Sequence, residues 1–162
     1  MTISDLLQAP QHIPLLAAWH HSEWAYLNPG GSLEQRIEKM QAYLSGDVIP
    51  KTYVCLCNGQ PAGSAAIVTC DMETHPEWTP WLASVYVAPA LRRQGIGSAL
   101  VKHAMSQTGL AGMQRLFLFT PDRADFYRKL GWQHLTEECY RGHAVTLMQF
   151  DPTGQASPAN KR

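Results

Sequence analysis

The chain has 162 residues, of which 45% are hydrophobic and 16% are charged, and this balance is typical of one globular domain. Its 13 lysine and arginine residues offset 13 aspartate and glutamate residues, so the formal net charge is zero. A neutral chain lacks the basic surface of a dedicated nucleic-acid binder, and it gives no reason to expect an anionic membrane as a partner.

The first part of the chain has the pattern of two helices. Residues His12–Trp24 predict the first helix, with Pro14 near its start, where proline is tolerated. Ser32 begins the second helix, because Ser32 and Gln35 have the spacing of a capping box. The apolar residues that fall on one face of this second helix are Leu33, Ile37, Met40 and Leu44.

The periodicity then changes to that of strands. Residues Thr52–Cys57 are rich in β-forming side chains, and Asn58–Gly59 is a strong hairpin turn. Residues Gly63–Cys70 form the expected return strand. A loop over Asp71–Pro80 separates it from a third strand over Trp81–Val87.

The second half of the chain alternates between the two periodicities. It predicts a helix over Gly97–Gln107, a central apolar strand over Leu116–Thr120 and a short helix over Asp122–Leu130. Two final strands are expected over Gln133–Tyr140 and His143–Phe150. The resulting order, α-α-β-β-β-α-β-α-β-β, favours an α+β fold with a mixed sheet over a doubly wound one.

The domain boundaries follow from this pattern. We expect one domain over residues 1–150 and a disordered tail over residues 151–162, which are small and polar. The N-terminal segment lacks a basic stretch followed by a long apolar one, so we expect a cytoplasmic protein. None of the four cysteines forms a CxxC pair, and His20 and His21 have no second ligand pair at metal spacing, so we expect no metal.

The segment Val85–Leu100 carries the most specific pattern. A strand runs into a turn with two glycines, and that turn opens a helix, so several backbone N–H groups converge at the positive end of the helix dipole. Gly95 and Gly97 lack a β-carbon and let a phosphate approach the backbone closely. Arg92 and Arg93 add positive charge suited to a pyrophosphate.

Other phosphate-binding loops fit this segment poorly. A dinucleotide-binding loop needs a third glycine where Leu100 stands, and a Walker A loop needs lysine after Gly97, which is followed by Ser98. A nucleotide-binding protein of another class is therefore disfavoured. A structural glycine turn without a ligand stays open at this point.

Two blocks resemble the GNAT acyltransferase superfamily. The run Arg92-Arg93-Gln94-Gly95-Ile96-Gly97 is similar to its R/Q-x-x-G-x-G/A signature, with a strand and a proline before it and a helix after it. The run Ala124–Trp132 resembles its A-x-F-Y-x-K-L-G-F/Y/W motif. The resemblance implies an α+β fold in which helices flank a mixed, largely antiparallel sheet with a splayed central strand pair.

The resemblance also implies acetyl-CoA as co-substrate. The loop residues that would cradle its pyrophosphate are Arg92, Arg93, Gln94, Gly95, Ile96, Gly97 and Ser98. The backbone of Val85, Tyr86 and Val87 would bind the pantetheine arm and offer an N–H to the thioester oxygen. Many members carry an asparagine that contacts this arm where this chain has Thr120 or Asp122.

The implied reaction is transfer of an acetyl group from acetyl-CoA to a primary amine by direct attack. Tyr127 matches the tyrosine that serves as general acid for the leaving thiolate. A lysine-like amine has a pKa near 10.4, so a base or a water chain must remove its proton. Among the loop carboxylates Asp71 and Glu73 we expect Glu73 to be the base, and Ser84 or Tyr86 could instead hold a water.

Four aromatic residues are candidates for the acceptor pocket, namely Trp24, Tyr26, Trp78 and Trp81. Ordinary packing explains each of them equally well when taken singly. The acceptor would be a small-molecule amine or an amine of a peptide or protein, and a homodimer would agree with the family. The competing hypothesis is a non-catalytic module that senses acyl-CoA.

Overall fold

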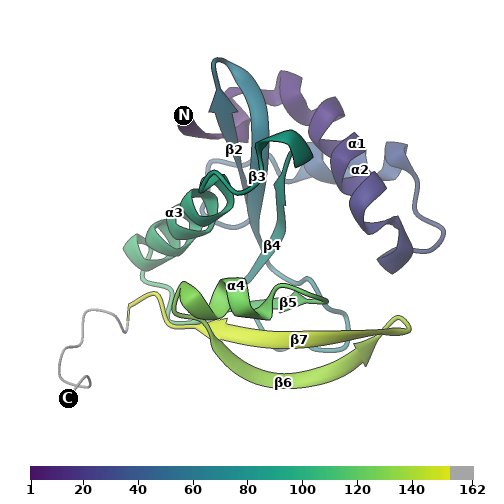
Figure 1. The fold of residues 1–162 in the computed structure, drawn as a ribbon, viewed down its shortest axis with the longest axis vertical. Coiled ribbons are helices and arrows are strands. Elements are labelled where there is room, and N and C mark those ends of the chain that lie inside the picture. Colours follow the sequence, from purple (N-terminus) through teal and green to yellow (C-terminus); the bar gives the residue numbers. More distant parts are fainter. Residues whose placement is uncertain (154–162) are drawn as a thin grey trace.

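Seven strands form one sheet in the order β1-β2-β3-β4-β5-β7-β6 in the computed structural model, which describes residues 1–153 (Figure 1). The strands are β1 (Thr2–Asp5), β2 (Lys51–Cys57), β3 (Gln60–Val68), β4 (Trp81–Val87), β5 (Leu116–Thr120), β6 (Gln133–Tyr140) and β7 (His143–Phe150). The α-helices are α1 (Ile13–Trp24), α2 (Leu33–Ala42), α3 (Ile96–Leu110) and α4 (Ala124–Lys129). Short 3₁₀ turns cover Leu6–Gln8, Pro10–His12, Ala25–Leu27 and Pro89–Leu91.

The centre of the sheet is splayed. Every neighbouring pair of strands is antiparallel except β4 and β5, which run parallel and share one register pair, Trp81 opposite Phe117. Figure 1 shows the consequence, since β2, β3 and β4 stand upright while β5, β7 and β6 cross below them. The predicted fold class, a mixed and largely antiparallel sheet with a splayed central pair, is confirmed.

Strand β1 is absent from the predicted order, and the structure corrects this. Thr2–Asp5 pairs antiparallel with β2 at the edge of the sheet, where Asp5 accepts a hydrogen bond from Lys51. Four residues are too few to establish an alternating pattern, and their partner strand begins at residue 51. The sequence therefore predicts six strands, whereas the described residues form seven.

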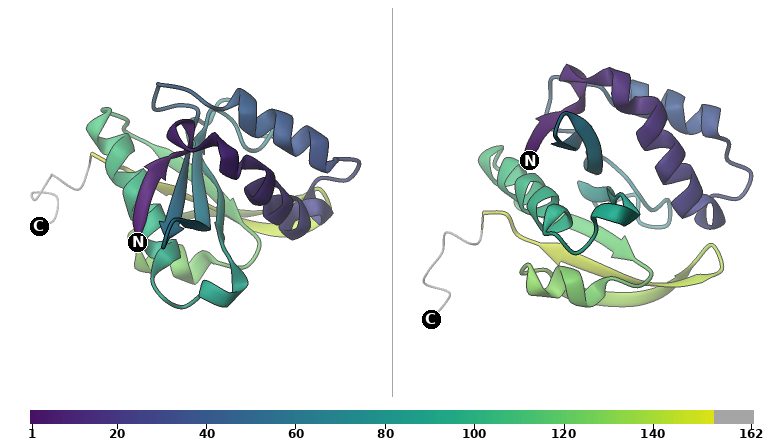
Figure 2. Two further views of the ribbon diagram at one scale, coloured as in Figure 1. Left: turned by 90° about the horizontal axis from the view of Figure 1, so that it is seen from above. Right: turned by 45° about the horizontal axis from the view of Figure 1, so that its top comes forward.

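Helices cover both faces of the sheet (Figure 2). The apolar face of α3, with Leu100 and Val101, packs on one side together with Tyr127 of α4. Helices α1 and α2 pack on the other side through residues such as Leu16 and Met40. The predicted capping box of α2 is confirmed, because Gln35 N donates to Ser32 Oγ at 3.1 Å and Ser32 N donates to Gln35 Oε1 at 3.0 Å.

The end of the described chain lies just past β7. Thr153 donates two hydrogen bonds to Asp151 Oδ1, at 2.9 Å from its N and 2.8 Å from its Oγ1. The disordered tail predicted for residues 151–162 otherwise falls on residues 154–162, which lie outside the described part. Across residues 1–153, no helix combines the length and apolar character needed to cross a membrane.

Gly63 on β3 leaves no room for a side chain beneath β4. A β-carbon there would overlap Tyr86 O and would lie 3.2 Å from Leu100 Cδ1 and 3.3 Å from Val87 Cα. We therefore expect Gly63→Ala to push β4 away and to lower the free energy of unfolding by about 2 kcal/mol, as overpacking does. Urea denaturation measures this change.

Gly46 provides the matched control for that substitution. A β-carbon at Gly46 meets no atom within 4 Å among the described residues, so Gly46→Ala should change the unfolding free energy by less than about 0.5 kcal/mol. Equal urea midpoints for Gly63→Ala and Gly46→Ala would contradict the close approach of β3 and β4.

Candidate functional site

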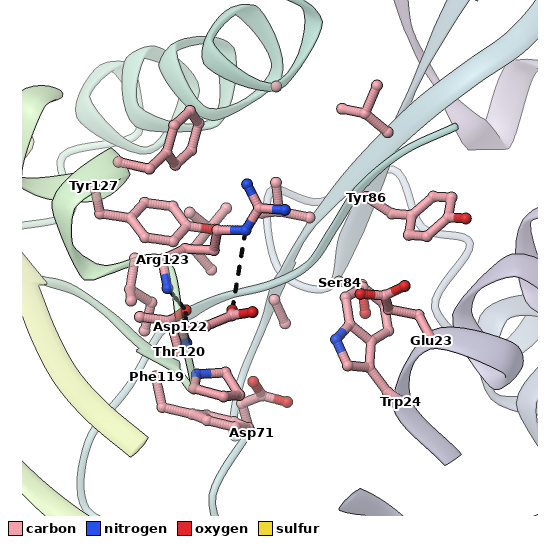
Figure 3. A pocket seen from close by; sticks show the side chains of 18 of the residues that line it. Glu23, Trp24, Asp71, Ser84, Tyr86, Phe119, Thr120, Asp122, Arg123 and Tyr127 are labelled. Atoms are coloured by element: carbon pink, nitrogen blue, oxygen red, sulfur yellow. Dashed lines mark hydrogen bonds and ion pairs between the residues drawn. The ribbon is translucent and has the colours of Figure 1, made fainter. Parts of the chain in front are cut away.

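A cleft of about 600 Å³ opens where β4 and β5 diverge (Figure 3). One wall carries Tyr127, Arg123 and Asp122, and the facing wall carries Ser84 and Tyr86 with residues from the end of α1. The start of α3 borders one end of the cleft, and α2 with the β6–β7 turn borders another part. A cleft of this volume suits a small-molecule ligand.

A bulge in β4 helps to open the cleft. The pairing of β3 with β4 shifts by one residue between Ser64 opposite Tyr86 and Ala66 opposite Ala83. Ser84 lies inside this bulge with a φ of 54°, in the left-handed region that residues other than glycine seldom adopt. A bulge bends the strand and increases its local twist, so β4 turns away from β5.

A buried histidine holds the bulge in place. Ser64 Oγ donates to Ser84 O at 3.0 Å and lies 2.8 Å from His20 Nε2. Because the single serine proton is used on Ser84 O, His20 must donate from Nε2. Burial, with a smaller contribution from nearby Arg36, lowers the pKa of His20 to about 3, so the imidazole stays neutral and keeps this donor.

The glycine loop leads into the start of α3, which lacks a side-chain cap among the described residues. Arg93 has a φ of 67° and Gly95, the N-cap, has a φ of 85°, so the loop folds back beneath the first helical turn. The first N–H groups of a helix have no intrahelical acceptor, so these remain available to a ligand in the cleft.

Most of the sequence-predicted cofactor residues come together here. Those that line the cleft are Val85, Tyr86, Val87, Arg92, Arg93, Gly95, Ile96, Gly97 and Ser98. Gln94 lies outside the lining. Arg92 also braces the loop, since its Nε donates to Val87 O at 2.8 Å and its guanidinium lies 5.3 Å from the Tyr86 ring centroid.

Tyr127 lies on α4 with its hydroxyl directed into the cleft (Figure 3). Its ring is buried against Phe126 and Trp132, at centroid distances of 5.0 and 6.0 Å. Burial raises the pKa of Tyr127 well above the ordinary tyrosine value of 10.0. The phenol therefore keeps its proton throughout the neutral range, where its O–H can donate a hydrogen bond or a proton.

Thr120 and Asp122 occupy the turn before α4, where the resemblance implies an asparagine. Thr120 Oγ1 accepts a hydrogen bond from Arg123 N at 2.9 Å and so stabilises the start of the helix. Asp122 lies 4.0 Å from Arg123 Nε, and all three residues line the cleft. This turn brings a cation, Arg123, to the wall beside Tyr127.

The four aromatic candidates for the acceptor pocket separate in the structure. Trp24 lines the cleft, whereas Tyr26 lies outside it, exposed and 4.8 Å from the His143 ring. Trp78 and Trp81 pack in the core, where Trp78 stacks 5.0 Å from Phe117. The Trp81 Nε1 donates to Trp78 O, so this pair closes the loop against the sheet and does not face the cleft.

The two loop carboxylates also separate. Glu73 is exposed and lies outside the lining, with Oε1 at 3.2 Å from Arg141 Nη2. Asp71 lines the cleft and lies between Phe119 and Trp24 in Figure 3. Burial raises the pKa of Asp71 to about 6, although nearby Lys39, Arg36 and Arg141 act in the opposite direction.

Several lining residues were missed by sequence reasoning. Arg36 and Lys39 reach the cleft from α2, Tyr43 from the position that follows it, and Arg141 from the β6–β7 turn. The spacing of 36, 39 and 43 places these three side chains on a common helical face, and that signal was present in the sequence. Within residues 1–153, no group of three or more His, Cys, Asp or Glu residues could hold a metal ion.

A family model matches half of the chain. The model describes an acetyltransferase (GNAT) domain, and it matches residues 50–134, which include β4, the glycine loop, α3 and α4. A search of curated protein sequences gives no match.

Solved structures share the fold at low sequence identity. An aminoglycoside 6′-N-acetyltransferase complexed with coenzyme A is 14% identical, with a TM-score of 0.76 over 94% of this chain and 97% of its own. A ribosomal-protein-alanine N-acetyltransferase from Brucella melitensis is 19% identical, with a TM-score of 0.72 over 93% and 99%. The yncA protein from Salmonella typhimurium, solved with its cofactor acetyl-CoA, is 18% identical, with a TM-score of 0.67 over 94% of both chains.

Proposed function

Because this chain belongs to the GNAT acetyltransferase family, we propose that it transfers an acetyl group from acetyl-CoA to a primary amine by direct attack. One observation carries the proposal: a single cleft joins the uncapped start of α3, the splayed edge of β4 and the Tyr127 hydroxyl. The amine acceptors named for two fold neighbours, an aminoglycoside and a ribosomal-protein alanine, agree with an amine as the acceptor class. We assign this activity to one domain over residues 1–150.

The residues of the cleft fit the chemistry of acetyl-CoA. The open N–H groups at the start of α3 and the exposed Arg93 suit a pyrophosphate. Gly97 leaves room beside Val87 and Phe126, whose nearest atoms would lie 3.5 and 3.6 Å from a β-carbon. Past Trp81 no described strand pairs with the β5-facing edge of β4, so that edge can bind the amides of a pantetheine arm as an added strand would.

When bound, acetyl-CoA supplies an acetyl group activated as a thioester. Backbone N–H groups of β4 near the bulge are placed to donate to the oxygen that gains negative charge as the amine attacks. The network of His20, Ser64 and Ser84 fixes the direction of that backbone. Tyr127 holds its proton and donates it toward the leaving sulfur.

We propose Asp71 in place of Glu73 as the proton acceptor. Asp71 lines the cleft, and a pKa of about 6 leaves it ionised at neutral pH yet basic enough to take a proton. The Glu73 carboxylate lies outside the lining and pairs with Arg141. That pairing suits Glu73 to holding Arg141 at the rim of the cleft.

Replacing Tyr127 by phenylalanine tests the acid role. Tyr127→Phe keeps the ring packing and removes the donor, so kcat should fall by about 100-fold while the acetyl-CoA Kd stays within about twofold. Steady-state thiol release and calorimetry measure the two quantities. Tyr26→Phe, at an exposed site outside the cleft, is the control and should match the wild type. Wild-type turnover by Tyr127→Phe at every pH would remove the acid role.

A second candidate function is a module that binds acyl-CoA without turnover. Calorimetric titration with acetyl-CoA tests the binding that both functions share. Amine-dependent release of free thiol then separates them, because a sensor binds acetyl-CoA saturably and releases none. The buried, protonated Tyr127 and the raised pKa of Asp71 in one cleft favour the enzyme.

A further inference from the structure

The cleft is also lined by residues of α2 and of the β6–β7 turn, which lie on the other side of β4 from α3 (Figure 1). With the pyrophosphate at the start of α3 and the acetyl group at the bulge, the cofactor does not occupy this part of the cleft, and the acceptor can bind there. Its lining includes Arg36, Lys39, Tyr43, Asp71 and Arg141. The charges on these side chains therefore bear on the kind of amine that enters, an inference that rests on the proposed function.

Arg36 and Lys39 form no close ion pair, and Asp71 is the one carboxylate within residues 1–153 whose charge acts on both. Among the described residues no carboxylate lies within the 4.0 Å ion-pair distance of either side chain. Burial lowers the pKa of both groups, although Asp71 acts in the opposite direction. The Arg36 side chain is half-buried, whereas Lys39 remains exposed to water. Lys39 Nζ lies 5.8 Å from the Tyr43 ring centroid, a contact that holds the ammonium on the cleft side of α2. Two cations that share one carboxylate leave room for a ligand that brings a second negative charge, above all at the half-buried Arg36.

Arg141 adds a third, firmly positioned cation. Its Nη1 donates to Leu27 O and to Asn28 Oδ1, both at 2.9 Å, and its Nη2 donates to Glu73 Oε1 at 3.2 Å. The guanidinium carbon also lies 4.9 Å from the Tyr140 ring centroid. These contacts tie the β6–β7 turn to the segment after α1, so that a fixed guanidinium, paired on one side with Glu73, lies at the rim of the cleft.

Within the described part of the chain, two carboxylates act on these three cations: Asp71, which lines the cleft, and Glu73, which lies outside the lining and pairs with Arg141. With Asp71 ionised, the acceptor end keeps an excess of positive charge. A polycationic amine would be repelled there, and a simple monoamine would leave Arg36 and Lys39 with Asp71 as their one shared counter-charge. An acceptor with its own negative group satisfies both requirements, since Asp71 can face the amine while the cations face the anion.

We propose that the acceptor is a small amine that also carries a carboxylate, that is, an amino acid or a close relative. Its carboxylate binds at Arg36 and Lys39, and its amine lies toward Asp71 and the bulge of β4. Arg36 is the stronger anchor of the two, because a guanidinium can bind a carboxylate through two parallel hydrogen bonds.

A panel of matched amines tests this proposal. Each L-amino acid is compared with its carboxamide and with its decarboxylated amine, and spermidine serves as a polycation, with CoA release as the readout. We expect kcat/KM to be at least about tenfold higher for the preferred amino acid than for its amide, as a hydrogen bond to a charged group implies. Amides or plain amines used equally well would overturn the proposal and leave the acetyltransferase intact.

Variants of α2 locate the carboxylate. Arg36→Gln and Lys39→Gln should each raise the amino-acid KM by about tenfold or more, while kcat/KM for the amide changes by less than about twofold. Arg115→Gln and Lys102→Gln remove the same charges from exposed positions outside the cleft and should behave as wild type. An equal loss on acid and amide would mean that Arg36 is merely structural, and thermal melts check that each variant is folded.

The same assays separate this proposal from the one on which it rests. Acetyl-CoA binding together with acetylation of amines other than amino acids would overturn the amino-acid proposal alone. Failure of acetyl-CoA to bind, or the absence of CoA release with every amine, would overturn the acetyltransferase function itself.

Discussion

Gly97→Glu is expected to abolish acetyl-CoA binding without unfolding the protein. Gly97 is the second residue of α3, and a β-carbon there would make only ordinary contacts, at 3.5 Å from Val87 Cγ2 and 3.6 Å from Phe126 Cζ. A carboxylate in the first helical turn also suits the helix dipole. The glutamate charge, however, lies where the pyrophosphate should bind and repels it. The same carboxylate can accept hydrogen bonds from the backbone N–H groups at the start of α3 that would otherwise bind the pyrophosphate.

Calorimetric titration measures this loss. We expect the acetyl-CoA Kd of Gly97→Glu to rise by at least about 100-fold, which corresponds to about 2.8 kcal/mol of binding free energy. Gly97→Ala adds only the β-carbon, for which the cleft has room, and should bind within about fivefold of wild type. Wild-type affinity in Gly97→Glu would show that the anion site at α3 does not hold the cofactor.

Asp71→Asn is expected to lower kcat by about 100- to 1,000-fold and to remove the acidic limb of the pH–rate profile. The pKa of Asp71 is about 6, raised by burial and held back by Lys39, Arg36 and Arg141. In the wild type Asp71 therefore becomes protonated as the pH falls through about 6, and kcat/KM should decline below that value because the base is no longer available. Asparagine cannot accept the proton at any pH, so the limb near 6 should be absent.

Glu73→Gln is the matched control for the base. Its carboxylate lies outside the cleft lining, so the variant should keep a limb near pH 6 even if the Arg141 contact loosens. Steady-state rates from pH 5 to 9 decide between the two carboxylates. Loss of the limb in Glu73→Gln together with its retention in Asp71→Asn would reverse the assignment.

At neutral pH, Asp71→Asn should raise the free energy of unfolding while it lowers the activity. The carboxyl has a pKa of about 6 when folded against an ordinary value of 3.8, so the folded state binds more protons between these values. The contribution of Asp71 to stability is therefore lost as the pH rises from about 4 to 6. At pH 7.5 we expect Asp71→Asn to gain about 1 to 3 kcal/mol in unfolding free energy, measurable by urea denaturation. A loss of stability would argue against a carboxyl whose pKa is raised in the folded state.

The sequence predicted those parts of the fold that short-range residue patterns determine. The capping box at Ser32 and Gln35, the turn at Asn58–Gly59 and the apolar run Leu116–Thr120 each report a local preference that the structure keeps. Strand β1 could not be found this way, because Thr2–Asp5 is ordered by its pairing with Leu56 to Tyr53, about fifty residues away.

The candidate site was predictable where it lies in contiguous sequence. The glycine loop and Tyr127 each belong to a short motif, so their chemistry could be inferred from neighbouring residues. The acceptor end combines α2, the loop after β3 and the β6–β7 turn, and only the folded chain brings these segments together. Which of two carboxylates, Asp71 or Glu73, faces the cleft depends on the path of one loop.

The aromatic candidates show the limit of composition as a guide. Trp78 and Trp81 were candidates for the acceptor pocket, yet their rings pack on Phe117 and on each other. A large aromatic side chain buries much apolar surface when it packs between a loop and a sheet. Such residues are therefore as well suited to the core as to a ligand pocket. Trp24 differs because it stands at the end of α1, beside the open cleft.

The most direct test of the central claim is to incubate the protein with acetyl-CoA and a panel of amines and to measure free thiol and acetylated amine together. The mechanism predicts that CoA is released only when an accepted amine is present, in equal amount to the acetylated product identified by mass spectrometry. Saturable acetyl-CoA binding without amine-dependent thiol release or acetylated product would contradict it and would leave an acyl-CoA-binding module.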